Sequence, residues 1–211
     1  MSTPVSSKQS LRYFALGDSY TIGENVAENE RWPNQLAAML SEKNIQTEVT
    51  IIARTGWTTD ELWQGIHANP PQGIVDLVSL LIGVNNQYRG YDINEYREQF
   101  RFLLGKSIEY AGNDATRVMV LSIPDWGVTH FASSRDRKQI ARDIDAFNSV
   151  KREESEKAGV RFVDVTPISR KAKNDLSLIA SDDLHPSGKM YFEWAKLALP
   201  EALNVLEVIK K

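Results

Sequence analysis

The chain has 211 residues, of which 42% are apolar and 25% charged, the composition of an ordinary globular protein with a substantial core. This length fits one sizeable domain better than two small ones. A net charge of -3 and a pI near 5.7 offer no electrostatic reason to expect nucleic acid or an anionic membrane as a partner. Without cysteine, the chain excludes disulfides, cysteine-ligated zinc and a thiol nucleophile.

The N-terminal residues are polar and predict a disordered head, residues 1–10, ahead of a single domain over residues 11–211. The head lacks the apolar stretch of a secretion signal, and no run approaches the roughly eighteen apolar residues of a membrane span. We therefore expect a soluble, cytoplasmic protein without an integral membrane segment, although a secreted protein whose signal had been removed would share this pattern. The helices show no heptad seam, so the oligomeric state is left open.

Apolar runs and helical spacing alternate along the chain. Apolar or β-branched runs predict five strands, at residues 11–16, 47–53, 75–82, 116–123 and 160–165. Helical patterns follow them, at residues 32–42, 58–67, 93–111, 136–158 and 187–209, the last interrupted at Pro200. Such alternation predicts an α/β domain with a parallel sheet covered by helices on both faces.

Candidate reactive residues follow the strands of this predicted sheet. Ser19 follows the first strand, Gly56 the second and Asn85 the third. Asp182 and His185 come after the fifth strand. Because ligands of open parallel sheets bind beyond the carboxyl ends of the strands, we expect all of these residues at one edge.

A serine is a poor nucleophile at neutral pH unless a base lies within hydrogen-bonding reach. Of the three histidines, His67, His130 and His185, only the last has an aspartate, Asp182, three residues before it. A tight turn can bring that carboxylate to the far ring nitrogen, where it holds the imidazole in the tautomer that a base requires. The pattern predicts Ser19 as nucleophile, His185 as base and Asp182 as its orienting group.

Acyl transfer also needs donors for the oxyanion that forms on the carbonyl carbon. The backbone N–H groups of Ser19 and Gly56 and the side-chain amide of Asn85 are the candidates. The Gly-x-Ser-x-Gly elbow of α/β-hydrolases is absent, because the pentapeptide at residues 17–21 lacks the second glycine. Asp18 lies too near Ser19 to act as its base and is expected to cap the following turn.

Four blocks of the chain together resemble the SGNH (GDSL-type) esterase and lipase family. They are Gly17-Asp18-Ser19, Gly56, Gly83-Val84-Asn85 and Asp182-x-x-His185, in that order along residues 17 to 185. The resemblance implies a flavodoxin-like, three-layer α/β/α fold with a five-stranded parallel sheet. It also implies hydrolysis of esters or related acyl groups of small molecules, with no cofactor and no metal. Two positions depart from the family pattern: Tyr20 replaces the usual leucine, and Asn86 the aspartate that often follows the third block.

The substrate is less clearly indicated. Trp126 and Phe131 follow the fourth strand, and we expect them either to wall an apolar pocket or to pack on the sheet. Trp57, next to Gly56, has the same two alternatives. Tyr88 is a candidate to bind a polar or anionic leaving group, whereas Arg89 is expected to pair with a surface carboxylate. No insertion resembles a lid, which predicts an open groove and short to medium acyl esters, such as acetyl esters or lysophospholipids.

Two other functions are consistent with parts of the pattern. A metal-dependent phosphoesterase would use Asp18, Asp182, Asp183 and His185 as ligands, since mixed aspartate and histidine sites bind divalent metals. That reading leaves the glycine and asparagine blocks without a role. A non-catalytic binding module on the same fold is the other alternative, but such a module tends to lose the reactive residues that this chain retains.

Overall fold

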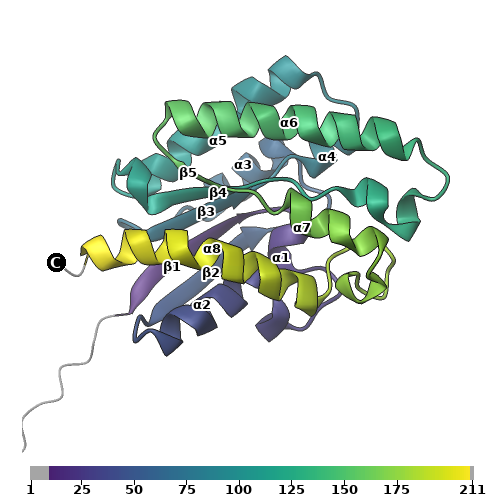
Figure 1. Ribbon diagram of the computed structural model, residues 1–211. Coiled ribbons are helices and arrows are strands. Elements are labelled where there is room, and N and C mark those ends of the chain that lie inside the picture. Colours follow the sequence, from purple (N-terminus) through teal and green to yellow (C-terminus); the bar gives the residue numbers. More distant parts are fainter. Residues whose placement is uncertain (1–9, 210–211) are drawn as a thin grey trace, which may run out of the picture.

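A parallel sheet forms the centre of the protein, whose computed structural model describes residues 10–209 (Figure 1). Except for Ser10, the predicted disordered head lies outside the described residues. Within the described part of the chain the sheet has five strands in the order β2-β1-β3-β4-β5. The strands are β1 (Leu11–Gly17), β2 (Thr47–Ala53), β3 (Leu77–Leu81), β4 (Val118–Leu121) and β5 (Arg161–Val163). This is the strand order of flavodoxin-like folds, so the predicted α/β class is confirmed.

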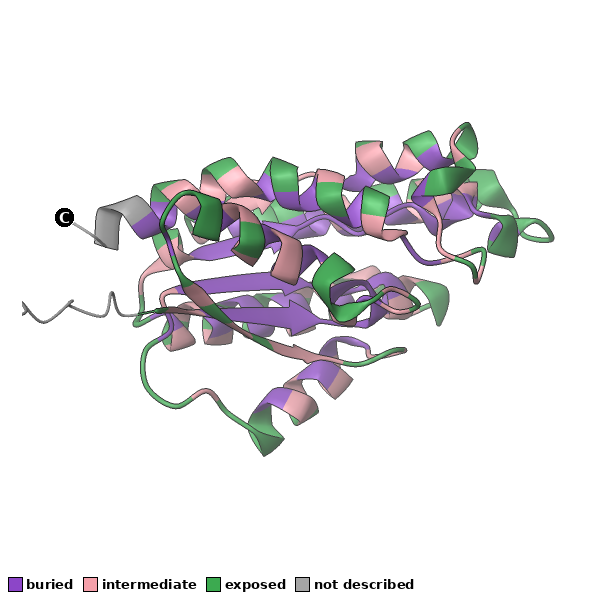
Figure 2. Cartoon of the chain, turned by 90° about the horizontal axis from the view of Figure 1, so that it is seen from below, coloured by how far each residue is buried: buried purple, intermediate pink, exposed green. Residues whose placement is uncertain are grey.

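Helices cover both faces of the sheet. They are α1 (Ser19–Ile22), α2 (Trp32–Glu42), α3 (Thr59–Ala68), α4 (Val84–Tyr88), α5 (Ile93–Tyr110), α6 (Arg137–Lys157), α7 (Thr166–Arg170) and α8 (Gly188–Ile209). Helices α2 and α8 pack side by side on one face, and α3, α5 and α6 lie on the other (Figure 1). The central strand β3 is buried along its whole length, as its continuous apolar sequence predicts, while the helices turn exposed faces outward (Figure 2).

The last helix differs from its prediction. Pro200 was expected to interrupt it, but α8 continues through this residue. A proline inside a helix removes the hydrogen bond to the carbonyl four residues earlier, here that of Lys196. Both Lys196 and Pro200 are exposed, so water can satisfy the carbonyl that loses its partner. Packing of the apolar face, including fully buried Trp194 and Ala198, outweighs the lost bond.

A glycine at the end of β3 is required by both conformation and space. Gly83 has φ +124, and a Cβ there would lie 2.5 Å from the hydroxyl of Tyr96. We expect Gly83→Ala to lower the free energy of unfolding by about 1–3 kcal/mol or more. Gly105 is the matched control, because it lies inside α5 and a Cβ there would meet nothing within 4 Å. Gly105→Ala should raise stability by about 0.5–1 kcal/mol, and urea unfolding of the two variants tests the contrast. Equal changes in the free energy of unfolding for the two variants would contradict a special requirement for glycine at residue 83.

The topology fixes where a site can form. The chain passes from β1 to β2 on one side of β1, while β3 lies on its other side. Such a reversal of strand order leaves a crevice beyond the carboxyl ends of the two strands. The residues after β1 and β3 include Ser19 and Asn85, which therefore lie at this crevice.

Candidate active site

Ser19 is held by the turn that links β1 to α1. It is the first residue of α1, and Asp18 caps that helix by accepting the backbone N–H of Tyr20 at 3.0 Å. The predicted capping role of Asp18 is confirmed. Its carboxylate is fully buried, whereas Ser19 is 5% exposed and lines a cavity. The helix cap thus turns the carboxylate inward and leaves the serine hydroxyl at the crevice.

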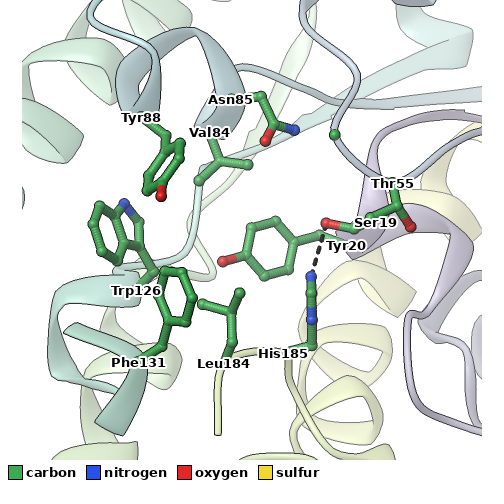
Figure 3. Close-up of a pocket in the computed structure, with 11 residues that line it drawn as sticks. Ser19, Tyr20, Thr55, Val84, Asn85, Tyr88, Trp126, Phe131, Leu184 and His185 are labelled. Atoms are coloured by element: carbon green, nitrogen blue, oxygen red, sulfur yellow. Dashed lines mark hydrogen bonds between the residues drawn. The ribbon is translucent and has the colours of Figure 1, made fainter. Parts of the chain in front are cut away.

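His185 connects Ser19 to Asp182. Its Nε2 lies 3.0 Å from Ser19 Oγ, and its Nδ1 lies 2.5 Å from Asp182 Oδ2 (Figure 3 shows the serine contact). Asp182 Oδ1 also accepts the backbone N–H groups of Leu184 and His185, at 3.1 and 3.0 Å. The side chain of Asn25 donates to Oδ2 at 2.6 Å. Each carboxylate oxygen is therefore oriented by more than one donor.

The loop that carries Asp182 and His185 is shaped by its own backbone. Asp183 has φ +62, an uncommon conformation for a residue other than glycine, and it produces the sharp turn between the two. The His185 carbonyl accepts the N–H of Ala180 at 2.7 Å, which closes the loop. Burial raises the pKa of Asp182, but the hydrogen bonds from His185 and Leu184 outweigh it and lower the pKa below its ordinary value. The carboxylate is therefore ionised at neutral pH.

A second loop, after β2, reaches the same cavity through Thr55 and Gly56. Gly56 has φ +86, which favours glycine, and its carbonyl accepts Nη2 of Arg89 at 2.7 Å. Arg89 also pairs with Glu61 at 3.3 Å, so its predicted pairing with a surface carboxylate is confirmed. Asn85 Nδ2 donates to the Trp57 carbonyl at 2.9 Å. An amide nitrogen has two N–H groups, so this bond orients the second one.

Asn86, one of the two departures from the family pattern, connects two elements beside the cavity through Thr59. Its side chain is fully buried, and its Oδ1 accepts the backbone N–H of Thr59 at 3.1 Å. Its Nδ2 donates to the Thr59 hydroxyl at 2.8 Å. Because Thr59 begins α3, the amide ties α4 to the start of the helix that follows the Gly56 loop.

The residues gathered here line a cavity of about 180 Å³. Its lining is Ser19, Tyr20, Thr55, Gly56, Val84, Asn85, Tyr88, Trp126, Phe131, Leu184 and His185 (Figure 3). Three aromatic rings form one wall, with centroids 5.4 Å apart for Tyr88 and Trp126 and 6.0 Å for Trp126 and Phe131. Trp57 was considered both as a lining residue of this cavity and as a packing residue, and the structure has it packing. Its ring packs on Gly65, where the absence of a side chain makes room, and it lines a separate hollow beside β2.

Sequence reasoning missed two residues near the site. Asn25, which contacts Asp182, is 157 positions away from it, and a lone loop asparagine carries no signal of that contact. Lys151 is fully buried in α6 and donates to the carbonyl of Ile82, next to Gly83, at 3.1 Å. Burial lowers the pKa of Lys151 to about 7, against the opposing effect of the Asp18 charge. Its spacing of four residues after Phe147, within the apolar stripe of α6, was the available signal.

Two further observations concern the described residues as a whole. Among residues 10–206, whose side chains the structure describes, no three histidine, aspartate or glutamate side chains form a group that could hold a metal ion. Asp18 in particular is turned into the core, away from Asp182 and His185. In the same part of the chain, no helix combines the length and apolar character needed to cross a bilayer.

A parallel α/β sheet with a serine hydrogen-bonded to a histidine at its carboxyl edge is the arrangement of a hydrolase that attacks acyl groups. The profile of the GDSL-like Lipase/Acylhydrolase family matches residues 15–191. The chain therefore belongs to this family and is a carboxylic ester hydrolase. The resemblance inferred from the four sequence blocks is confirmed.

Several solved structures share the fold. TesA is 15% identical, with a TM-score of 0.73 over 92% of this chain and 99% of its own. The psychrotrophic esterase EstA from Pseudoalteromonas sp. is 16% identical, with a TM-score of 0.72 over 93% and 98%. Axe2, an acetylxylan esterase from Geobacillus stearothermophilus, is 20% identical, with a TM-score of 0.68 over 91% and 94%. No curated protein sequence matches the chain significantly.

Proposed function

We propose that the protein is a serine esterase in which Ser19 is the nucleophile, His185 the general base and Asp182 the group that orients it. The observation that carries this proposal is the continuous chain from Ser19 Oγ to His185 Nε2 at 3.0 Å and from His185 Nδ1 to Asp182 Oδ2 at 2.5 Å. The first distance lies within the hydrogen-bonding range required for proton transfer from a nucleophile to its base. The second is a short hydrogen bond that holds the imidazole in place.

In this mechanism His185 Nε2 takes the proton of Ser19 as Oγ attacks the ester carbonyl carbon. The imidazolium that forms faces the ionised carboxylate of Asp182, which stabilises it. Collapse of the tetrahedral intermediate breaks the bond to the alcohol, and Nε2 gives the proton to the leaving oxygen. Water then repeats the sequence on the acyl enzyme, with the same base, and releases the acid.

Three donors are proposed to stabilise the oxyanion: the backbone N–H groups of Ser19 and Gly56 and the side chain of Asn85. All three residues line the cavity. The second N–H of Asn85 is oriented because the first is held by the Trp57 carbonyl. These donors are in place before the substrate binds, which is what makes an oxyanion hole effective.

Loss of the amide donor gives a specific prediction. Asn85→Ala should lower kcat by about 10²- to 10³-fold with little change in KM, because the amide acts on charge that exists only in the transition state. Steady-state kinetics on a p-nitrophenyl ester measure both parameters. Asn34→Ala is the matched control, since Asn34 lies on α2, donates to the Glu28 carbonyl and does not line the cavity. Equal kcat values for both variants would remove Asn85 from the mechanism.

The cavity is suited to a small ester. Its volume of about 180 Å³ lies below the roughly 300–1,000 Å³ of sites that enclose drug-sized ligands. Its wall is mainly apolar and aromatic, formed by Tyr88, Trp126 and Phe131. We infer a preference for short to medium acyl esters over long-chain fats. EstA is an esterase and Axe2 an acetylxylan esterase, which is compatible with this range.

The proposal is tested with p-nitrophenyl esters from acetate to decanoate, combined with labelling by diethyl p-nitrophenyl phosphate. We expect turnover that declines beyond medium chain lengths. The phosphate should add one diethylphosphoryl group to Ser19, located by peptide mass spectrometry, in proportion to the activity lost. Turnover that survives complete labelling, or a label on another residue, would contradict the serine mechanism.

The same assay separates the alternatives. A metal-dependent phosphoesterase would lose activity to a chelator, regain it with added divalent metal, and cleave p-nitrophenyl phosphate. The inward orientation of Asp18 speaks against its use as a ligand with Asp182 and His185. A binding module would show neither turnover nor labelling. We expect full activity in the presence of chelator.

A further inference from the structure

Tyr20 places a hydroxyl group on the aromatic side of the cavity. It follows Ser19 directly, and its ring lies across the cavity floor with the hydroxyl end toward Tyr88, Trp126 and Phe131 (Figure 3). The family pattern has leucine at this position, so the hydroxyl is a feature of this chain. Leu184 and Val84 complete the apolar surroundings of the ring.

The Tyr20 hydroxyl has no hydrogen-bond partner among the described residues, although the side chain is only 3% exposed. Buried tyrosine hydroxyls usually find one. The hydroxyl of Tyr191 also lacks a partner but is sealed in the core, whereas Tyr20 lines the cavity with its hydroxyl end toward the aromatic residues (Figure 3). Burial and the nearby charges of Asp18 and Asp125 raise the pKa of Tyr20, so the phenol stays neutral and can donate.

Other polar atoms of the aromatic wall are already engaged. Trp126 Nε1 donates to Gln87 Oε1 at 2.9 Å, and the Tyr88 hydroxyl meets Nη2 of Arg135 at 3.5 Å. An alkyl group that fills the cavity would displace water and leave the Tyr20 hydroxyl unpaired, which costs about 1–3 kcal/mol for a buried polar group. A group that carries an oxygen at that point would restore the hydrogen bond.

We propose that Tyr20 is a specificity-determining residue that hydrogen-bonds to a hydroxyl or carbonyl oxygen of the ester, so that short oxygenated esters are preferred to alkyl esters of equal length. The inference rests on the proposed esterase function and narrows its substrate class. The oxygen belongs to whichever part of the ester, acyl or alcohol, occupies the aromatic side of the cavity.

The ring of Tyr20 has a separate role. It packs on His185 with centroids 5.6 Å apart and on Trp194 at 6.2 Å. Removal of the ring should therefore disturb the base and affect every substrate alike. Removal of the hydroxyl alone should affect only discrimination. Tyr20→Phe and Tyr20→Leu separate the two roles.

The experiment compares kcat/KM within matched ester pairs. The acyl pair is p-nitrophenyl 3-hydroxybutyrate against p-nitrophenyl butyrate, and the alcohol pair is glycerol monoacetate against butyl acetate. We expect the wild type to prefer the oxygenated ester of one pair by about tenfold. Tyr20→Phe should lower kcat/KM for that ester and raise it for its alkyl partner, a crossover that general damage to the site does not produce.

Tyr191→Phe is the control, because it makes the same change at a buried hydroxyl that lies outside the cavity. Its oxygenated-to-alkyl ratio should equal that of the wild type in both pairs. Tyr20→Leu should lower kcat on all four esters. If Tyr20→Phe retains turnover and its oxygenated-to-alkyl ratio of kcat/KM is unchanged in both pairs, the role assigned to Tyr20 is wrong. The esterase function would not be affected by that result. Failure of the wild type to cleave any ester overturns the assignment together with the esterase function.

Discussion

Ser19→Ala is expected to lower kcat on p-nitrophenyl esters by about 10⁴- to 10⁶-fold, the range seen when a serine nucleophile is removed from other hydrolases. The hydroxyl oxygen forms the acyl bond, and alanine offers no substitute. The variant keeps the backbone N–H of residue 19, so the oxyanion donors stay in place. Binding of short esters against the aromatic wall should persist, because this binding does not use the Ser19 hydroxyl.

The fold should survive this change. Ser19 Oγ has a single side-chain partner, His185 Nε2, and that nitrogen lies beside the cavity where water can replace the bond. Ser79→Ala is the matched control, because Ser79 is fully buried in β3 and bonds the Tyr13 hydroxyl at 2.9 Å. That variant should lose about 1–3 kcal/mol of stability, with Tyr13 left unpaired, and keep its kcat. Full activity in Ser19→Ala would remove Ser19 from the mechanism.

Most of the fold followed from sequence periodicity alone. The apolar runs that become β3 and β4 are clear because a strand buried between helical layers contains almost no polar residue. Boundaries were less accurate: the run at residues 160–165 yields only Arg161–Val163 as strand. Strand ends depend on the neighbour with which each residue pairs, and a single sequence does not contain that pairing. The continuation of α8 through Pro200 depended on burial in the same way.

Site residues could be predicted from the sequence in two cases. Either their contact spans only a few residues of the chain, or they follow strands that end at the same edge of the sheet. Asp182 and His185 meet across one turn, so spacing alone predicted their contact. The contact from Asn25 to Asp182 needs the folded chain, because the two residues come from separate loops. The choice between the two orientations considered for Trp57 also needs the folded chain. Sequence placed it beside Gly56, but packing on Gly65 turns its ring away from the cavity.

Asp182→Asn should lower kcat by about 10³- to 10⁴-fold while leaving the loop nearly unchanged. The amide oxygen can keep the two backbone hydrogen bonds now made by Oδ1, from Leu184 and His185. The amide nitrogen then takes the place of Oδ2 and donates to His185 Nδ1. A donor at Nδ1 places the imidazole proton on Nε2, which faces Ser19 and can no longer accept its proton. The tautomer, rather than the geometry, is what the variant changes.

Asp175→Asn provides the comparison, since Asp175 accepts the N–H of Ser177 in a similar turn but lies outside the cavity. Its kcat should match that of the wild type. Nitrogen-15 NMR of the histidines tests the cause directly: His185 should carry its proton on Nδ1 in the wild type and on Nε2 in Asp182→Asn. Asn25, whose amide now donates to Oδ2, should turn its oxygen toward the new donor, which keeps the loop hydrogen-bonded. A variant that loses activity with its proton still on Nδ1 would show that Asp182 acts through its charge on the imidazolium instead of through the tautomer.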